Sequence, residues 1–446
     1  MSPAPVAFGE ALRFWLKLGF VSFGGPAGQI AIMHRELVEA RRWISERRFL
    51  HALNYCMVLP GPEAQQLATY IGWLLHGTRG GIVAGTLFVL PSLAILVALS
   101  WLYMRFGEVP AIAALLAGVK PAVVAIVLAA AARIGSRILR HRALWAVAAA
   151  AFLALFAFSV PFPAVILAAG LAGLAGRRWA PHVFDAPTHS AATSAPHVPA
   201  LLDDATPAPA HARMSAARIA VIVATALVLW GAALGALALA WGWRGDFTQM
   251  GWFFTKAALV TFGGAYAVLP YVLQGAVEQH GWLSATQMID GLALGETTPG
   301  PLIMVVAFVG FLGGWTKALL GPEALVAAGI AGAAIATFFT FLPSFLFILA
   351  GGPLVEHTRG DLKLAAPLTA ITAAVVGVIV NLAVFLAWRV FWPEATALAP
   401  FSGRFDALAA AIAAASLYAL VRRGVGVIPV IAGAGLAGLA AWALGA

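Results

Sequence analysis

An internal duplication is the sequence feature that most restricts how this chain can fold. Residues 14–62 align without a gap with residues 253–301, at a constant offset of 239. The aligned positions share a lysine, a tryptophan, Phe-Gly-Gly and Pro-Gly-Pro in register, which chance matches between apolar segments do not produce. Further along, the offset becomes 252, since Leu-Pro-Ser at 90–92 returns at 342–344. The two halves therefore share one fold, and the second carries a 13-residue insertion near 317–329.

Long apolar runs around these motifs predict membrane helices. The run 81–104 (GIVAGTLFVLPSLAILVALSWLYM) is apolar almost throughout, whereas the strands of a transmembrane β-barrel alternate polar and apolar residues. Of the 446 residues, 62% are hydrophobic and 10% charged, against about half and about a quarter in soluble domains. The sequence therefore predicts an all-α polytopic membrane protein of two homologous halves, with the lipid bilayer as its surroundings.

The polar residues exclude several other classes of protein. The net charge of +9 agrees with the enrichment of Lys and Arg in the cytoplasmic loops of membrane proteins, so we expect no nucleic-acid partner. The single cysteine, Cys56, excludes an internal disulfide and a cysteine metal cluster. The ten histidines lack ligand spacing, and the sequence has no phosphate-binding loop or nucleophile elbow. We therefore expect no enzyme activity, no cofactor and no metal.

The duplication divides the chain into four parts. Residues 1–176 form the first repeat, residues 243–446 form the second, and residues 217–242 form an extra transmembrane helix before the second repeat. Residues 177–216 are rich in Pro, Ala, Ser and His, and this composition predicts a disordered linker that is dispensable. Each repeat contains six apolar segments, so the chain has thirteen spans if all of its segments cross the membrane.

Two kinds of interruption leave the count between nine and thirteen spans. The first segment of each repeat contains Phe-Gly-Gly and the second contains Pro-Gly-Pro, and both motifs interrupt helical hydrogen bonding. If all thirteen segments cross, the Lys and Arg residues of the loops split 10 to 13 between the two sides. If the interrupted segments are re-entrant, the split is 18 to 5. The charge asymmetry favours re-entrant segments in the first repeat and constrains the second repeat little.

The extra helix determines how the two repeats are related. If both interrupted segments cross, or neither does, each repeat has an even number of crossings and the extra helix turns the second repeat upside down. Residues 35–48 carry five arginines, whereas the equivalent residues 274–287 carry no Lys or Arg, as opposite sides of a membrane predict. We therefore expect an inverted repeat, with a parallel repeat as the alternative. Residues 34–48 and the linker are then cytoplasmic.

The broken helices are the candidate substrate site. Unpaired backbone groups at membrane depth are tolerated where they are buried in protein or line a polar cavity, and the N-termini of half-helices turn N–H groups toward an anion. Glycine allows the backbone to approach a ligand, and proline suits the first turn of a helix. The alternative is that Gly-Gly lets helices pack closely and that proline kinks them. The residues expected to bind the anion are Gly24, Gly25, Pro26, Pro60, Gly61, Pro62, Gly263, Gly264, Pro299, Gly300 and Pro301.

Ionisable and polar side chains near the breaks complete the candidate site. Lysine inside an apolar segment is costly and typically functional, so we expect three lysines to offset the charge of the anion, although the first of them is near enough to the N-terminus to reach the interface. They are Lys17, Lys256 and Lys120. Neighbouring carboxylates either carry a coupling proton or pair with these lysines. The coupling or lining groups are Glu63, Gln65, Glu296, Thr297 and Thr298.

Several of these stretches resemble the chromate ion transporter family. They are FWLKLGFVSFGGPAGQI (14–30), LPGPEAQQLATYIG (59–72), LFVLPS (87–92), FGGAYAVLPYV (262–272) and LALGETTPGPLIMVVAFVGFLGG (292–314). The resemblance covers nearly the whole chain apart from the linker. It implies a bacterial inner-membrane exporter of chromate, whose two-domain form confers chromate resistance.

The residues themselves predict an anion transporter and leave alternatives open. Chromate and sulfate are tetrahedral dianions of similar size, so sulfate or another oxyanion is an alternative substrate. A passive anion channel is a further alternative, and so is a structural or sensory membrane protein, against which the duplication and the paired breaks count. Without a nucleotide-binding motif, transport would run on an ion gradient or on the membrane potential. The coupling ion and the direction stay open, and a homodimer is compatible with the sequence.

Overall fold

The computed structural model describes residues 5–23, 25–184, 199–204, 206–207, 209–262, 264–357, 365–395, 399 and 401–445. Within these ranges the chain is helical, and its one strand-like feature is a single bridge between Ile44 and Leu202. Five of the described helices are long and apolar enough to cross a membrane. The predicted all-α membrane fold is confirmed.

The helices of the first repeat follow the order of its apolar segments. They are α1 (Phe8–Val21), α2 (Gly25–His34), the π-helix η1 (Arg35–Ala40), α3 (Glu46–Val58), α4 (Glu63–Phe106), α5 (Pro110–Ile138), α6 (Arg142–Phe156) and α7 (Phe162–Trp179). A short helix, α8 (Pro181–Phe184), and a 3-10 turn, η2 (Ala210–Ala212), follow in the linker.

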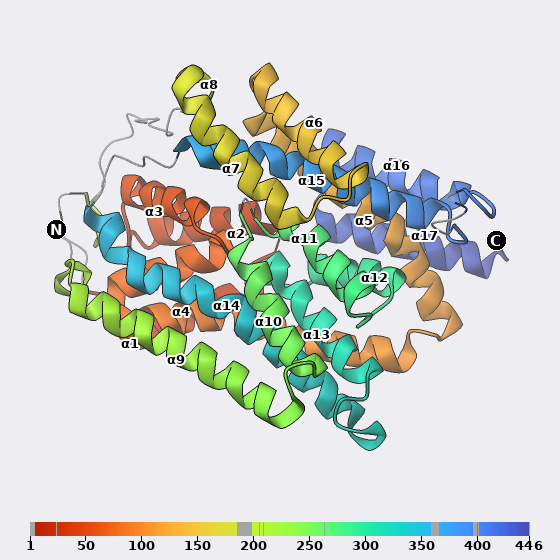
Figure 1. Ribbon diagram of the computed structural model, residues 1–446, viewed down its shortest axis with the longest axis horizontal. Coiled ribbons are helices and arrows are strands. Elements are labelled where there is room, and N and C mark those ends of the chain that lie inside the picture. Colours follow the sequence, from red (N-terminus) through yellow and green to blue (C-terminus); the bar gives the residue numbers. More distant parts are fainter. Residues whose placement is uncertain are drawn as a thin grey trace.

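The second repeat begins after the extra helix, α9 (Ala216–Trp241), which lies at the periphery of the molecule (Figure 1). Only 11% of the most apolar stretch of α9 is buried in the protein, as expected for a helix that faces lipid. The remaining elements are α10 (Asp246–Leu259), α11 (Ala265–Leu273), η3 (Gln274–Gln279), α12 (Ala285–Thr297), η4 (Leu302–Met304), α13 (Val305–Thr316), η5 (Pro322–Ala324), α14 (Leu325–His357), α15 (Ala365–Phe391), α16 (Ala407–Arg422) and α17 (Val427–Ala443).

Helix α4 consists of two antiparallel parts joined by a tight turn. At His76 and Gly77 the backbone leaves the helical conformation, and Gly77 has a φ of +63°. Gly72, before the turn, packs against Gly80 after it, because a Cβ on Gly72 would lie 2.6 Å from the Gly80 carbonyl oxygen. In the second repeat the inserted residues lengthen the equivalent turn, which separates α13 from α14.

The Phe-Gly-Gly segment of the first repeat enters the protein and returns to the same side. The ring of Phe8, at the start of α1, contacts the ring of His76 at the turn of α4. Arg41, which follows α2 and η1, pairs with Glu10 in the first turn of α1 at 3.3 Å. The two ends of the segment therefore lie together, and the break lies at the far end of a re-entrant hairpin.

The Pro-Gly-Pro segment of the first repeat is a second hairpin from the same side. Ser45, at the start of α3, donates to Asp204 at 2.6 Å, and the carbonyl of Trp73, near the end of the first part of α4, accepts from His211 at 2.8 Å. Both ends of this hairpin thus contact residues 199–213. We refer to this end of the molecule as the linker face.

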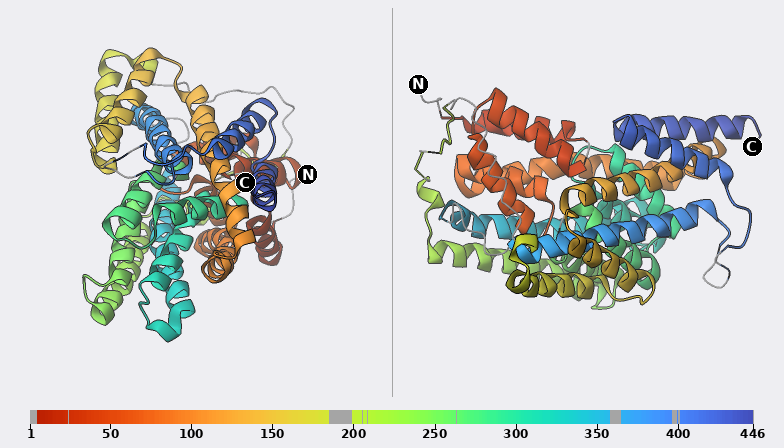
Figure 2. Two further views of the ribbon diagram at one scale, coloured as in Figure 1. Left: turned by 90° about the vertical axis from the view of Figure 1, so that its right-hand side faces the viewer. Right: turned by 90° about the horizontal axis from the view of Figure 1, so that it is seen from above.

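The hairpins of the second repeat enter from the other end, which we refer to as the opposite face. Trp282, between η3 and α12, donates to Asp246 at the start of α10 at 2.8 Å. Its carbonyl accepts from Thr316 at the end of α13 at 2.9 Å. Helix α14 ends at the linker face, where Arg48 pairs with Glu356, whereas the second part of α4 begins there and runs away from it. Equivalent helices of the two repeats thus run in opposite directions, which confirms the inverted repeat (Figures 1 and 2).

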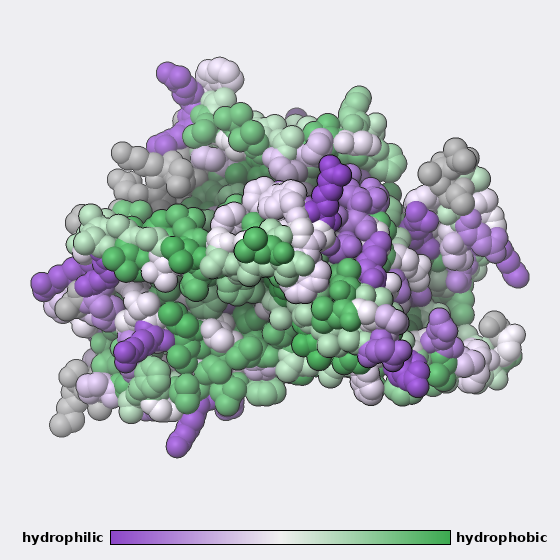
Figure 3. Space-filling view, turned by 60° about the horizontal axis from the view of Figure 1, so that its bottom comes forward, coloured by the Kyte–Doolittle hydropathy of each residue, from purple (hydrophilic) through white to green (hydrophobic). Residues whose placement is uncertain are grey.

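The hairpins lower the number of helices that can cross the membrane. Within the described ranges, the uninterrupted apolar helices outside the hairpins are the second part of α4, α5, α6, α7, α9 and α14 to α17. Five of these nine helices, α4, α5, α9, α14 and α15, are long and apolar enough to cross a membrane, so the number of spans stays a prediction. Hydrophobic side chains cover most of the face drawn in Figure 3, as a surface in contact with a bilayer requires.

The linker is ordered where the structure describes it. The Leu202 amide donates to the Trp43 carbonyl at 3.0 Å, and the side chain of Leu202 is buried with that of Ala212. The expectation of disorder across 177–216 is therefore wrong for the part that the structure describes, and residues 185–198, 205 and 208 lie outside that part. Composition misjudged this part because it averages over the whole segment and misses local anchors.

Candidate functional site

The four helix breaks meet through two backbone hydrogen bonds that the duplication relates. The amide of Gly61 donates to the carbonyl of Thr261 at 2.8 Å, and the amide of Gly300 donates to the carbonyl of Ser22 at 2.9 Å. Both the donors and the acceptors are equivalent positions at the offset of 239. The Pro-Gly-Pro of each repeat thus pairs with the Phe-Gly-Gly break of the other, and two carbonyls left free by the breaks are satisfied.

Each Pro-Gly-Pro also lies against the Leu-Pro-Ser of the other repeat. A Cβ on Gly61 would overlap the hydroxyl of Ser344, and a Cβ on Gly300 would lie 2.7 Å from the Cβ of Ser92. Ser92 and Ser344 are equivalent at the offset of 252. The three repeated motifs therefore converge on one place in the fold.

The repeated glycines at the breaks have a backbone conformation that L-amino acids rarely adopt. Their φ angles are +66° at Gly25, +127° at Gly61, +95° at Gly264 and +96° at Gly300. A Cβ on Gly25 would meet no atom within 4 Å, and one on Gly264 would meet Oε1 of Glu63 at 3.8 Å. The second glycine of Phe-Gly-Gly is thus required by the positive φ of its backbone and not by close packing. The preceding glycines, Gly24 and Gly263, lie outside the described residues.

A small pocket lies where the half-helices begin. It is lined by the first residues of α2, α4, α11 and the η4–α13 segment: Pro26, Gln29, Pro62, Glu63, Ala64, Gly264, Ala265, Pro301 and Leu302. Its volume of about 10 Å³ is enough for about one water molecule, so the breaks are closed around it. The structure therefore brings together part of the predicted site from all four interrupted segments.

The electrostatics of this pocket favour an anion. Each helix N-terminus carries roughly +0.5 of an elementary charge, so four termini supply about +2. Backbone N–H groups at helix N-termini bind phosphate, sulfate and carboxylate groups. Among the lining residues, Glu63 is the one charged side chain, and it has no hydrogen bond or ion pair with the residues that the structure describes. The helix N-termini are therefore the source of positive charge at this pocket, since no lysine or arginine is among its lining residues.

Among the residues that the structure describes, several buried polar atoms beside the pocket have no hydrogen-bond partner. The Gln29 side chain is 1% exposed; its amide nitrogen donates to the carbonyls of Gly300 and Ser22, and its Oε1 accepts no hydrogen bond. The buried hydroxyls of Ser92 and Ser344 are also without a hydrogen-bond partner. Sequence reasoning missed all three residues: Gln29 lines the pocket, whereas Ser92 and Ser344 lie against the glycines of Pro-Gly-Pro and are not among the lining residues. The repeated Leu-Pro-Ser was the signal for the two serines, and no repeat marked Gln29.

The repeated lysines do not lie in the pocket, which corrects their predicted place. Lys17 and Lys256 are exposed on the outer sides of α1 and α10, and Lys256 lies over the ring of Trp252 at 5.7 Å. The physical reason is that the other sides of these helices carry the buried aromatic residues, such as Phe14 and Phe253. Lys120 is also outside the pocket and lies 3.6 Å from Asp290.

The predicted polar residues divide between the pocket and its surroundings. Glu63 lines the pocket, whereas Glu296 accepts from the hydroxyl of Tyr266 at 2.5 Å and is not among the lining residues. Gln65 donates to Thr69 at 3.1 Å, one helical turn along α4. The others make local bonds: Thr297 donates to the Leu294 carbonyl, Thr298 donates to the Gly295 carbonyl, and the Pro60 carbonyl accepts from Gln66, while Pro299 is buried.

Within the described part of the chain, no group of three or more His, Cys, Asp or Glu side chains is placed to hold a metal ion. The chemistry of the pocket is therefore that of backbone dipoles, hydroxyl and amide groups and one carboxylate.

Comparison with known proteins agrees with this geometry. A family model described as "Chromate transporter" matches residues 9–174 and 248–439, which are the two repeats. The chain belongs to the chromate transporter family. Members of this family are similar to the chain along most of its length, so the comparison covers the breaks, the pocket and the long helices together.

Three relatives show how far the similarity extends. The chromate transport protein of Pseudomonas aeruginosa is 35% identical over 383 residues, which cover 84% of this chain and 80% of the relative. The chromate transport protein of Cupriavidus metallidurans is 29% identical over 394 residues, covering 87% and 85%. The probable chromate transport protein of Synechococcus elongatus is 28% identical over 378 residues, covering 84% of each. No solved structure matches the chain.

Proposed function

We propose that this protein is a secondary transporter that exports chromate across the bacterial inner membrane and so confers chromate resistance. The observation that carries the proposal is the pocket at the N-termini of four half-helices from two inverted repeats. Membership of the chromate transporter family supports chromate as the substrate. Inverted-repeat transporters place their substrate sites near the bilayer midplane at discontinuous helices, which supports transport rather than a structural role.

The expected binding mode follows from the charges. A tetrahedral dianion would accept hydrogen bonds from the free N–H groups of the four termini, whose summed charge of about +2 matches its own. Gln29 and the two unpaired serines would add donors from two sides. Because the pocket holds about one water molecule, an oxyanion would enter only when the breaks move apart.

Glu63 gives this site a means of coupling to protons. Its carboxylate belongs to the first turn of α4 and lines the pocket, so a dianion bound beside the ionised form would face a like charge. We expect Glu63 to take up a proton when the dianion binds. The dianion and this proton together carry a net charge of −1 outward. A membrane potential that is negative inside favours this step by about 2.3 kcal/mol per 100 mV.

Flux measurements with the purified protein in proteoliposomes test the proposal. Labelled chromate should move across the vesicle membrane in response to an imposed potential, and excess sulfate should compete because it has the same charge and shape. Flux of chromate that saturates and depends on the potential supports the proposal. Flux of sulfate without chromate would reassign the substrate, and flux that does not saturate would indicate a channel.

A further inference from the structure

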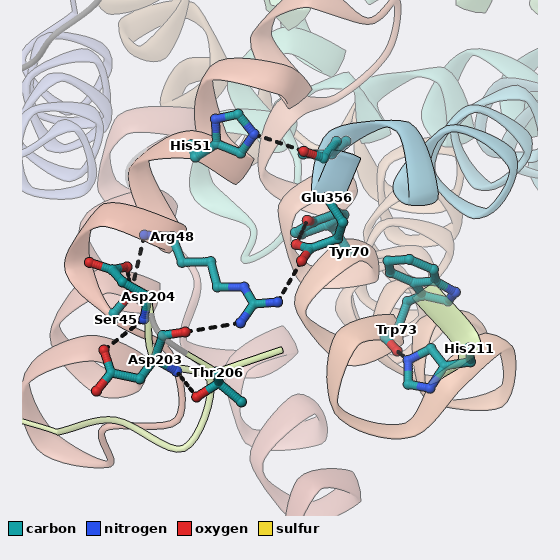
Figure 4. A network of polar contacts seen from close by, with 11 residues as sticks. Ser45, Arg48, His51, Tyr70, Trp73, Asp203, Asp204, Thr206, His211 and Glu356 are labelled. Carbon is teal, nitrogen blue, oxygen red and sulfur yellow. Dashed lines mark hydrogen bonds and ion pairs between the residues drawn. The ribbon is translucent and has the colours of Figure 1, made fainter. Parts of the chain in front are cut away.

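Two ionic clusters with buried carboxylates lie away from the pocket, one toward each face. In the first, Nη2 of Arg48 on α3 pairs with Oε2 of Glu356 on α14 at 2.5 Å, and the hydroxyl of Tyr70 donates to Oε1 of Glu356 at 2.5 Å (Figure 4). The side chains of Arg48 and Glu356 are 3% and 2% exposed. We refer to these three residues as the linker-face latch.

The second cluster joins the equivalent helices nearer the opposite face. The hydroxyl of Tyr103, near the end of α4, donates to Oδ2 of Asp290 on α12 at 2.9 Å. Nζ of Lys120 on α5 lies 3.6 Å from Oδ1 of Asp290, and the side chains of Lys120 and Asp290 are 24% and 3% exposed. We refer to these residues as the opposite-face latch.

The duplication relates neighbours of the linker-face latch to residues of the opposite-face latch. His51 and Asp290 are equivalent at the offset of 239, and Tyr103 and Val355 are equivalent at the offset of 252. The ring of His51 contacts the backbone carbonyl of Val355 at 3.0 Å, whereas Asp290 accepts from the side-chain hydroxyl of Tyr103. In both places the helix that leads into Pro-Gly-Pro of one repeat is tied to the end of the long helix of the other repeat. A tie between these two helices is thus repeated, whereas the ion pairs are not, because Arg48 and Glu356 are equivalent to Gln287 and Met104.

Each latch lies between the pocket and one face. Arg48 is ten residues before Val58, the end of α3, and is therefore about 15 Å along the helix from the Pro-Gly-Pro break. Asp290 is seven residues before Thr297, the end of α12, which corresponds to about 10 Å. Separation of either latch would part the two repeats on one side of the pocket only.

We propose that the two latches are the gates of the transport pathway, and that one opens while the other stays closed. This inference rests on the proposed function, because a gate requires a substrate that passes it. Alternating access in inverted-repeat transporters moves one repeat or bundle against the other around a fixed site, and both latches are bonds between repeats. A buried charge that loses its partner is costly, so a latch is stable only when it is paired and dry or separated and hydrated.

The two latches differ in the length of the ion pair and in the exposure of its cation. The linker-face latch is short and dry, whereas the opposite-face latch has a longer ion pair and a partly exposed lysine. Arg48 also donates to the carbonyl of Asp203 at 3.2 Å, so the linker segment holds the first latch from outside (Figure 4). Both latches are therefore paired in this structure, and the linker-face latch is the more buried of the two.

Access to the pocket from each face tests the gates without any substrate. The reporter is a single cysteine, Ala64→Cys, placed in the pocket lining in a Cys56→Ala background. A membrane-impermeant thiol reagent is applied to vesicles of known orientation, from one side at a time. Glu356→Gln should raise the labelling rate from the linker face roughly ten-fold, and Asp290→Asn should raise it from the opposite face. The exposed carboxylate variant Glu323→Gln is the control and should change neither rate.

Charge exchange separates gating from general loosening of the fold. The pair Arg48→Glu with Glu356→Arg restores the ion pair with its charges exchanged, so labelling from the linker face should return toward the starting rate. If Glu356→Gln does not accumulate, Tyr70→Phe removes one bond of the same latch and should raise labelling from the same face. Labelling that rises equally from both faces, or does not rise at all, overturns the inference. If labelling changes on the expected face but the protein does not move chromate, the inference about the gates is supported and only the proposed function is contradicted.

Discussion

The amide of Gly61 donates to the carbonyl of Thr261 across 200 residues of sequence, at 2.8 Å. Its symmetry mate joins Gly300 to Ser22 at 2.9 Å. The breaks of each repeat therefore complete the hydrogen bonding of the other, which explains why both motifs occur in both halves. These two bonds supply donors to the carbonyls of Ser22 and Thr261 at the breaks. The N–H groups at the helix N-termini around the pocket are then the backbone groups available to a ligand.

The glycines of Phe-Gly-Gly should be sensitive to alanine through backbone conformation. Gly25→Ala and Gly264→Ala place a Cβ at φ of +66° and +95°, which costs about 1–2 kcal/mol per residue and turns the first N–H groups of α2 and α11. We expect chromate flux in proteoliposomes to fall at least ten-fold, with a modest loss of thermal stability. Gly231→Ala is the matched control on exposed α9, where alanine stabilises a helix by about 0.5–1 kcal/mol and flux should not change. Normal flux in both break variants would show that the motif serves packing and not the site.

The two unpaired serines should bind the oxyanion. Ser92→Ala or Ser344→Ala removes a buried hydroxyl that has no partner in this structure, so stability should be unchanged or slightly higher. A hydrogen bond to a charged group contributes about 1.5–3 kcal/mol, so KM for chromate should rise roughly ten-fold or more. Ser100→Ala is the control, because this buried hydroxyl donates to the Leu96 carbonyl within α4. A KM that stays the same in both variants would remove the serines from the site.

Sequence alone predicted the membrane fold, the duplication and the place of the breaks, because each depends on local patterns. Apolar runs and repeated Gly and Pro motifs report where a helix forms and where it must stop. The pocket is lined by Glu63 and by proline and glycine residues that were expected at the breaks, and their role in binding substrate stays a prediction.

The positions of the three lysines could not be predicted from local sequence patterns. Lys17 and Lys256 are repeated within apolar helices, but whether they face the pocket depends on which side of each helix packs against the protein. The buried aromatic residues occupy that side, so the two lysines are exposed. Lys120 was predicted for the anion and instead meets Asp290, a residue 170 positions away that no motif connects to it. Contacts between repeats therefore determine the ionic groups, and they could not be found from one repeat at a time.

The orientation of the protein can be tested with two cysteines. In a Cys56→Ala background, Arg47→Cys reports on the linker face and Gln279→Cys on the opposite face, and both side chains are exposed. The positive-inside rule predicts that an impermeant reagent outside the cell labels Gln279→Cys and leaves Arg47→Cys unlabelled until the membrane is opened. Labelling of Arg47→Cys alone would reverse the orientation and the direction of export with it. Labelling of both would contradict the inverted repeat.

The linker segment should detach as pH falls. His211 donates to the Trp73 carbonyl, and burial lowers the pKa of His211 in spite of that bond, with Arg218 and His76 nearby also lowering it. A lowered pKa means that docking favours neutral His211, so its contribution is complete above about pH 6.5 and is lost as pH falls toward the pKa of the folded state. Hydrogen exchange at the Leu202 amide should therefore lose protection between about pH 7 and pH 5. His211→Gln keeps a donor that does not titrate, and should remove this dependence; an unchanged pH profile would contradict docking through His211.

Glu63 should determine whether protons move with the anion. Glu63→Gln keeps the size of the side chain and removes the negative charge from the pocket, so the dianion should bind at least as tightly at high pH, where the ionised carboxylate would repel it. Chromate flux driven by the membrane potential should persist, whereas the uptake or release of protons that accompanies it, followed with a pH-sensitive dye in the vesicles, should disappear. Glu296→Gln is the matched control, because that carboxylate bonds to Tyr266 outside the pocket and its loss should leave proton movement intact. If Glu63→Gln still moves one proton with each chromate, the coupling group lies elsewhere and the helix N-termini bind the anion without help from this carboxylate.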